Sequence, residues 1–182
     1  MEAPYYNREW MTRVRRIHAD EGALLREIRL RALRDSPSAF SSTLDRELAY
    51  EDELWASRAS TASSGDKAAT FVAESGTQDW LGLVTILGAD HEAASGSGSA
   101  ELVSMWIAPE ARRLGLGEKL VQAALQFARG CNVPAMELSV TRGNESAMRL
   151  YLRLGFCLTS AASLPAHHAC SDELRLRIPL KR

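Results

Sequence analysis

The sequence has few cysteines and no pattern that would pair them. Cys131, Cys157 and Cys170 are odd in number and widely spaced, which fits neither a disulfide framework nor a C-x-x-C metal or redox pair. We therefore expect buried spectator thiols. His167 and His168 are adjacent and so lack the i, i+4 spacing of a zinc-binding helix. No metal site is predicted.

An excess of charge of one sign is also missing. The chain has 22 Lys and Arg against 23 Asp and Glu, which gives a formal net charge of -1. A near-neutral protein has no overall positive electrostatic field that would attract nucleic acid or an anionic membrane. We expect no nucleic-acid partner, and any anionic ligand must be held by a local site.

Long apolar runs are absent as well. The run LVSMWIA, residues 102–108, is far shorter than the ~20 residues that a membrane-spanning helix requires. The opening stretch MEAPYYNREWMTRVRR has neither the apolar region nor the small-residue cleavage site of a signal peptide. These two features predict a cytoplasmic protein with no membrane partner.

What is present indicates one globular domain over residues 1–182, with 46% hydrophobic residues and 25% charged residues. Apolar residues at helical spacing predict helices at 21–34, 44–59, 115–129 and 144–155. Alternating or continuous apolar runs predict strands at 10–19, 69–75, 80–89, 101–108, 135–141, 157–162 and 173–180. This order predicts an α/β (α+β) fold, a mixed sheet with helices on both faces. The nearly continuous apolar run at 101–108 indicates a strand buried on both faces.

Two glycines stand where the third long helix begins, in RRLGLGEKL, residues 112–120. A strand, a glycine turn and a helix N-terminus make an anion site, because unpaired amides point outward and the helix dipole favours negative charge there. Gly115 and Gly117 have no β-carbon, so their amides can approach a phosphate closely. The stretch predicts a phosphate-binding loop.

Two common phosphate loops do not fit this stretch. A Walker A loop requires G-x-x-x-x-G-K-[ST], but Gly117 is followed by Glu118, Lys119 and Leu120. A dinucleotide fingerprint requires G-x-G-x-x-G in a first βα turn, but position 120 is leucine and the stretch comes late in the chain. A nicotinamide oxidoreductase is therefore a distant alternative.

A third pattern is matched at every position. The stretch IAPEARRLGLG fits a strand ending in V-x-P followed by [Q/R]-x-x-G-x-[G/A], with matches at Ile107, Pro109, Arg112, Gly115 and Gly117. Downstream, NESAMRLYLRLGF fits N-x-x-A-x-x-x-Y-x-x-x-G-F, with matches at Asn144, Ala147, Tyr151, Gly155 and Phe156. In both motifs the chain resembles the Gcn5-related N-acetyltransferase (GNAT) family, specifically over residues 100–157.

The resemblance implies a single GNAT-like domain with a mostly antiparallel sheet of six to seven strands, splayed at the fourth strand. Residues 1–99 would supply the acceptor-side helices and first strands, 100–157 the acetyl-CoA-binding core, and 158–182 the C-terminal strands. It implies direct transfer of an acetyl group from acetyl-CoA to a primary amine. Members of the family are often homodimers, and nothing in the sequence decides between a monomer and a homodimer.

The same resemblance implies the cofactor contacts. The amides of the loop would cradle the pyrophosphate, namely those of Arg112, Arg113, Leu114, Gly115, Leu116, Gly117 and Glu118. The pantetheine arm would pair with the main chain of Met105, Trp106 and Ile107, where an amide near Trp106 or Ile107 would also donate to the oxyanion. Asn144 and Ala147 would face the cofactor. Arg153 would either touch the adenosine phosphate or lie on a solvated helix face.

Two residues are candidates for proton transfer. By the resemblance, Tyr151 is the general acid that protonates the departing sulfur, against the alternative of an aromatic side chain packed in the core. Glu101 opens its strand eleven residues before Arg112, where several family members carry a glutamate that deprotonates the amine through water. Glu137 on the next strand is the backup base, and water alone is the remaining option.

Other functions fit parts of this pattern. A non-catalytic acyl-CoA-binding sensor would keep the phosphate loop, although it would not need an acid such as Tyr151 at the thiol. Within the enzyme class, the acceptor is the amine of a small molecule or, alternatively, an exposed amine of a protein. The first half of the chain, which would decide this, carries no motif for a particular acceptor.

Overall fold

The computed structural model describes residues 12–88, 98–159 and 173–180. His167, His168 and Cys170, together with the ends of several predicted strands, lie outside these ranges. The elements run in the order β1 (Arg13–Arg16), α1 (Gly22–Asp35), η2 (Pro37–Ala39), α2 (Leu44–Leu48), α3 (Asp52–Ser63), β2 (Ala68–Glu74), β3 (Trp80–Leu87), β4 (Ala100–Ile107), η3 (Pro109–Ala111), α4 (Leu116–Gly130), β5 (Ala135–Thr141), α5 (Glu145–Arg153), β6 (Cys157–Leu158) and β7 (Glu173–Pro179).

The strands form one sheet of seven in the order β1-β2-β3-β4-β5-β7-β6. All neighbouring pairs are antiparallel except β4 and β5, which are parallel. The connection from β4 to β5 therefore needs a crossover, and α4 supplies it. The predicted mixed, mostly antiparallel sheet is confirmed.

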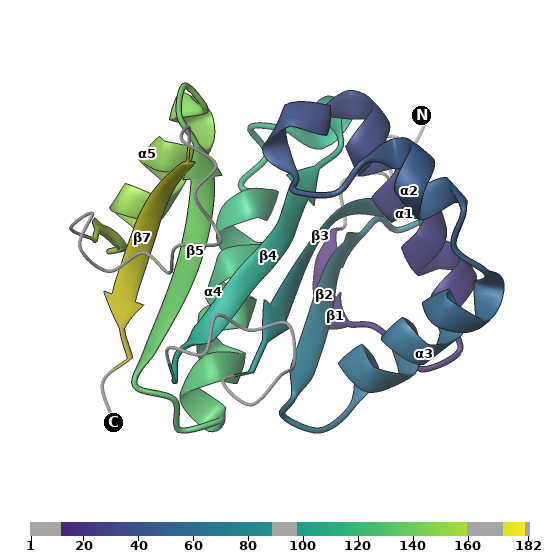
Figure 1. The fold of residues 1–182 in the computed structure, drawn as a ribbon, viewed down its shortest axis with the longest axis horizontal. Coiled ribbons are helices and arrows are strands. Elements are labelled where there is room, and N and C mark those ends of the chain that lie inside the picture. Colours follow the sequence, from purple (N-terminus) through teal and green to yellow (C-terminus); the bar gives the residue numbers. More distant parts are fainter. Residues whose placement is uncertain (1–11, 89–97, 160–172, 181–182) are drawn as a thin grey trace, which may run out of the picture.

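Helices cover both faces of the sheet, as predicted. In Figure 1, α1, α2 and α3 lie over one face of β2, β3 and β4, and α4 crosses behind the sheet. Leu120, Val121 and Ala124 of α4 are completely buried, because apolar residues recur on one side of this helix. Close packing is required here, since a β-carbon on Gly82 of β3 would lie 3.3 Å from the Leu120 side chain.

The parallel strands β4 and β5 separate soon after they begin. They pair only at Ala100 with Met136 and at Glu101 with Glu137, and Figure 1 shows them diverging beyond that point. On the other side of β4, its register against β3 shifts between Leu83 and Thr85. Ser104 has a left-handed φ of 56° there, which marks a β-bulge that bends β4 away from β5.

The prediction that β4 is buried on both faces was wrong in its second half. Residues 103–105 are only half-buried, because the bulge and the loss of pairing with β5 leave that side of the strand uncovered. A continuous apolar run is typical of a covered central strand, but this one lines an opening in the sheet.

The single helix predicted at 44–59 is two helices, α2 and α3. The chain turns at Ala49–Glu51, where Glu51 adopts an extended conformation and precedes α3. Asp52 and Glu53 then occupy the first turn of α3, where negative side chains interact favourably with the helix dipole. The helical spacing of apolar residues continues through the break, so periodicity alone could not locate it.

A buried ion pair joins α1 to α2. Glu47 is 3% exposed and accepts hydrogen bonds from Arg29 at 2.9 to 3.2 Å, and Arg29 stacks on Phe40 with its guanidinium 4.5 Å from the ring centre. Burial by itself raises the pKa of Glu47, but the bonds from Arg29 lower it below its ordinary value. The pair therefore stabilises the fold at neutral pH, and that contribution is lost as the pH falls through the lowered pKa.

Replacing Glu47 with leucine should lower the free energy of unfolding by about 3 kcal/mol, because it leaves Arg29 as an uncompensated buried charge. Urea unfolding at neutral pH measures this loss. The double variant Arg29→Leu/Glu47→Leu should be more stable than the single one. Equal stability of the single variant and the wild type would show that the pair contributes nothing.

Candidate functional site

The turn before α4 presents unpaired amides. Arg113 and Gly115 both have left-handed φ angles, 64° and 78°, which turn the chain sharply into the helix. The first helical amide with an internal partner is that of Lys119, which donates to the carbonyl oxygen of Gly115 at 3.2 Å. The amides of the three residues before it, Leu116–Glu118, form the free end of the helix, where the dipole favours an anion.

The two glycines of the turn serve different purposes. A β-carbon on Gly115 would meet nothing within 4 Å, so this position requires glycine for its φ of 78°. A β-carbon on Gly117 would lie 3.2 Å from the Leu150 side chain and 3.4 Å from that of Met105. Gly117 is therefore needed for space, because it faces the narrow region between α4, α5 and β4.

The edge of β4 that faces β5 is unpaired beyond Glu101, so it presents main-chain amides to the gap. The amide of Ala108 donates to Leu81 of β3 at 2.9 Å, and main-chain groups alternate sides along a strand, so Ile107 points away from β3 and towards β5. Trp106 lies in register with Leu83 and its main chain points towards β3 instead. Of the residues predicted to contact the pantetheine arm, Ile107 therefore turns its amide towards the gap.

The side chain of Arg112 turns away from the amides of the loop. Its Nε donates to the carbonyl oxygen of Ile107 at 3.1 Å, and its Nη2 bonds Oδ2 of Asp35 at the end of α1. The same carboxylate oxygen accepts from the Trp106 indole at 2.8 Å and from the Ser36 hydroxyl at 2.6 Å. The Ser36 bond, followed by those from Trp106 and Arg112, holds the pKa of Asp35 below its ordinary value despite partial burial.

Sequence reasoning missed Asp35. The residue comes just before Ser36 and Pro37, a combination that predicts only the end of a helix. Its partners Trp106 and Arg112 are 71 and 77 residues away, a separation across which one sequence gives no pairing signal.

The second motif forms α5 and its N-terminal cap. The Asn144 side chain accepts from the amide of Ala147 at 3.2 Å, which fixes the start of the helix. Arg153 at the other end pairs with Glu118 in the first turn of α4 at 3.2 Å. Both motifs are therefore adjacent, and α5 borders the free end of α4.

Tyr151 lies on α5 next to Leu150, the residue that faces Gly117. The tyrosine is 4% exposed, and its ring packs edge-on against Phe156 with 5.6 Å between ring centres. Burial raises the pKa of its phenol above the ordinary value. At neutral pH the group is protonated, as a proton donor must be.

The two candidate carboxylates stand side by side where β4 and β5 still pair. Glu101 is in register with Glu137 on β5 and with Leu87 on β3. Glu137 is 6% exposed and forms ion pairs with Arg175 and Arg177 of β7 at 3.2 and 3.1 Å. Glu101 is half-buried, and it lies where β4 and β5 are still paired.

Glu101 and the phosphate loop lie on opposite faces of the sheet. Leu87 and Leu83 of β3 share one face, and their partners Glu101 and Trp106 must share it too. Trp106 contacts Asp35, so this is the face covered by α1. Gly117 and its neighbours lie on the α4 face, and the gap between β4 and β5 connects the two.

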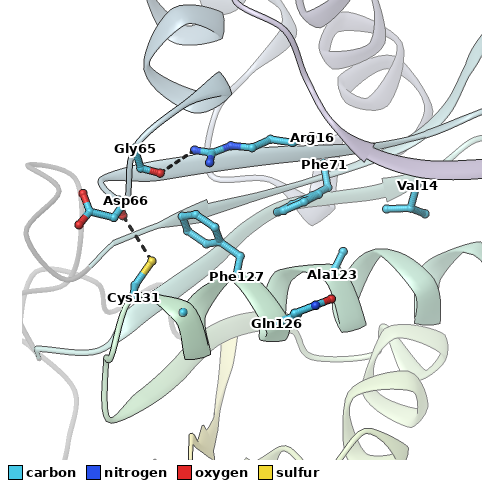
Figure 2. Close-up of a pocket in the computed structure, with 10 residues that line it drawn as sticks. Val14, Arg16, Gly65, Asp66, Phe71, Ala123, Gln126, Phe127 and Cys131 are labelled. Atoms are coloured by element: carbon cyan, nitrogen blue, oxygen red, sulfur yellow. Dashed lines mark hydrogen bonds between the residues drawn. The ribbon is translucent and has the colours of Figure 1, made fainter.

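A cavity of about 550 Å³ lies elsewhere, beside the C-terminal half of α4. Figure 2 shows Phe71 and Phe127 facing each other across it, with the Arg16 guanidinium 4.9 Å from the centre of the Phe127 ring. No residue of the phosphate loop lines it. The free amides at the start of α4 therefore lie away from this cavity.

Metal and membrane features are absent from the part of the chain that the structure describes. Within residues 12–88, 98–159 and 173–180, no cluster of three or more His, Cys, Asp or Glu side chains could hold a metal ion. Among the helices in these ranges, none is long and apolar enough to span a bilayer.

Solved structures that resemble this fold include several acetyltransferases. A GNAT-family acetyltransferase from Streptococcus pneumoniae superposes with a TM-score of 0.75 and 18% identity, covering 93% of this chain and 99% of that one. A putative acetyltransferase from Salmonella typhimurium, solved with its cofactor acetyl-CoA, gives a TM-score of 0.72 and 17% identity over 94% and 95% of the two chains. The PaiA N-acetyltransferase of Thermoplasma acidophilum, in complex with coenzyme A, gives 0.68 and 14% over 92% and 98%.

These superpositions establish a shared fold. The family follows from a comparison of sequences. Among curated proteins, none matches the chain. The sequence model of the acetyltransferase (GNAT) family, however, matches residues 27–156, which is well over half of the chain and includes the phosphate loop, the gap and α5. The chain therefore belongs to the GNAT acetyltransferase family.

Proposed function

We propose that this protein transfers an acetyl group from acetyl-CoA directly to the primary amine of a small molecule. The observation that carries the proposal is the pairing of a free helix end with an open strand edge. The amides of Leu116–Glu118 lie at one end of the gap, and the Ile107 amide points into it. If the diphosphate of acetyl-CoA bound at the helix end, its extended pantetheine arm would lie along the edge of β4.

Binding would use main-chain donors more than side chains. The diphosphate of acetyl-CoA would accept from the first-turn amides of α4, where the dipole stabilises it further. The pantetheine would add to β4 as a short extra strand in the space that β5 leaves open. Arg153, which pairs with Glu118 in the first turn of α4, would contact the adenosine phosphate.

The reaction needs a free amine, a stabilised oxyanion and a proton for the departing thiolate. The amine nitrogen forms a bond to the thioester carbonyl carbon while the carbonyl oxygen gains negative charge. The Ile107 amide would donate a hydrogen bond to this oxygen. The carbon–sulfur bond then breaks, and Tyr151 gives its proton to the sulfur so that coenzyme A leaves as a neutral thiol. The nitrogen loses one proton in turn, which restores the phenol of Tyr151.

Glu101 is the better candidate for the base. The ammonium form of the acceptor must lose a proton, and Glu101 on the α1 face can take it through water. Glu137 beside it forms a buried ion pair with Arg175 and a second ion pair with the exposed Arg177. The placement of Glu101 on the α1 face, from which the acceptor would approach, is the reason for the assignment.

Replacing Glu101 with glutamine should lower kcat/KM by about a hundredfold at neutral pH. The loss should shrink as the pH rises, because a larger share of the acceptor amine is then already deprotonated. The pH profile of kcat/KM for both enzymes measures this. Glu53→Gln on the exposed side of α3 is a matched control that should follow the wild type. A loss that stays constant with pH would remove Glu101 as the base.

A panel of amines tests the reaction itself. Release of free coenzyme A should depend on an added amine, and mass spectrometry of the product should show one acetyl group on nitrogen. Tight acetyl-CoA binding with no release over small amines, amino acids, polyamines and peptides would indicate a sensor. Transfer to peptide amines alone would reassign the acceptor to a protein.

A further inference from the structure

The segment between α1 and α2, residues 36–43, is attached to both strands that border the gap. On one side, Asp35 at the end of α1 bonds the Trp106 indole of β4 and the Arg112 guanidinium. On the other side, the Thr141 hydroxyl at the end of β5 donates to the carbonyl oxygen of Ser38 at 2.9 Å. The segment therefore crosses the opening on the α1 face of the sheet, where Glu101 lies.

Asp35 also connects this segment to the phosphate loop. Arg112 begins the turn before α4, and its side chain bonds Asp35 and the Ile107 carbonyl oxygen together. The amide of the same Ile107 is the group that points into the gap. One carboxylate thus contacts the start of the anion-binding turn, the open strand and the acceptor-side segment.

The contact is too weak to matter mainly for stability. Arg112 is 46% exposed and Asp35 is 23% exposed at the side chain, and ion pairs with this degree of exposure contribute little to the free energy of folding. The variant Asp35→Asn would retain an oxygen that accepts from the Trp106 indole, but it would lose the charge that holds Arg112. Such a variant separates positioning from folding.

We propose that Asp35 is a positioning residue that couples coenzyme binding at the turn before α4 to the placement of residues 36–43 over the acceptor side of the gap. The inference rests on the proposed function, because it takes the turn as the coenzyme site. Coenzyme on the loop fixes Arg112 and Ile107, Arg112 fixes Asp35, and Asp35 fixes the start of the segment. Residues 36–43 would thus be in place over the acceptor side once acetyl-CoA is bound.

Hydrogen exchange with mass spectrometry tests this on the full chain, with coenzyme A as the probe. In the wild type, coenzyme A should slow exchange in peptides that cover residues 112–119 and also in those that cover 36–43. The second effect should be about fivefold or more, the lower end of typical coupling between sites. In Asp35→Asn, the loop peptides should still be protected while protection of 36–43 is lost. Asp45→Asn, an exposed carboxylate on α2, is the matched control and should behave as the wild type.

Steady-state kinetics supply a second measurement. Asp35→Asn should lower kcat more than it raises the KM for acetyl-CoA, and Arg112→Gln should reproduce the loss of protection at 36–43. Equal protection of 36–43 in the wild type and in Asp35→Asn would overturn the coupling, as would a wild type in which only the loop is protected. Failure of coenzyme A to protect the loop at all would instead overturn the proposed function, so the two failures are distinguishable.

Discussion

Replacing Gly117 with tryptophan should reduce acetyl-CoA affinity by about a hundredfold or more, which corresponds to roughly 2.7 kcal/mol. The position is crowded, since even a β-carbon would approach Leu150 to 3.2 Å and Met105 to 3.4 Å. An indole there must occupy the space between α4, α5 and β4 that the coenzyme needs. Titration calorimetry with acetyl-CoA measures the loss.

The same helix provides the control. Gly130 is at the other end of α4, and a β-carbon there meets nothing within 4 Å. Gly130→Trp adds the same side chain far from the loop and should bind acetyl-CoA as the wild type does. If Gly117→Trp melts at the wild-type temperature and binds acetyl-CoA undiminished, this loop is not the coenzyme site.

Replacing Tyr151 with phenylalanine should lower kcat by at least about a hundredfold while acetyl-CoA affinity changes little. The change removes only the hydroxyl, and the ring can keep its packing against Phe156. Burial raises the pKa of this phenol, so the wild-type group is protonated and able to donate over the whole neutral range. The thiolate of the variant would have to leave without a proton.

Kinetics and binding measured together decide the role of Tyr151. Loss of kcat with a retained dissociation constant and melting temperature assigns the hydroxyl to the chemical step. A parallel loss of affinity and melting temperature would indicate that the hydroxyl stabilises the site instead. Turnover equal to that of the wild type would remove Tyr151 from the mechanism.

The sequence predicted the elements near the proposed coenzyme site well because their signals are local. The periodic apolar residues of α4, the Asn144 cap and the turn at Gly115 each depend on neighbours within a few positions. The two motifs also predicted which elements meet, and the ion pair between Glu118 and Arg153 connects them in the structure. Local chemistry and a spaced motif were sufficient here.

The sequence could not predict features that depend on contacts between distant residues. The break between α2 and α3 interrupts no apolar pattern, and the bulge at Ser104 lies inside a run that is typical of a covered strand. The partners of Asp35 and of Glu137 come from other elements, so none of their ion pairs could be inferred from spacing. The acceptor side is built mainly from such contacts, which explains why the substrate was the least predictable part.

The claim that the free helix end and the open strand hold the coenzyme is tested most directly by a crystal structure of the protein with coenzyme A. The account predicts the diphosphate about 2.9 Å from the amides of Leu116–Glu118, with the pantetheine along the unpaired edge of β4. Density for the coenzyme in the cavity between Phe71 and Phe127, or anywhere outside the gap between β4 and β5, would contradict it.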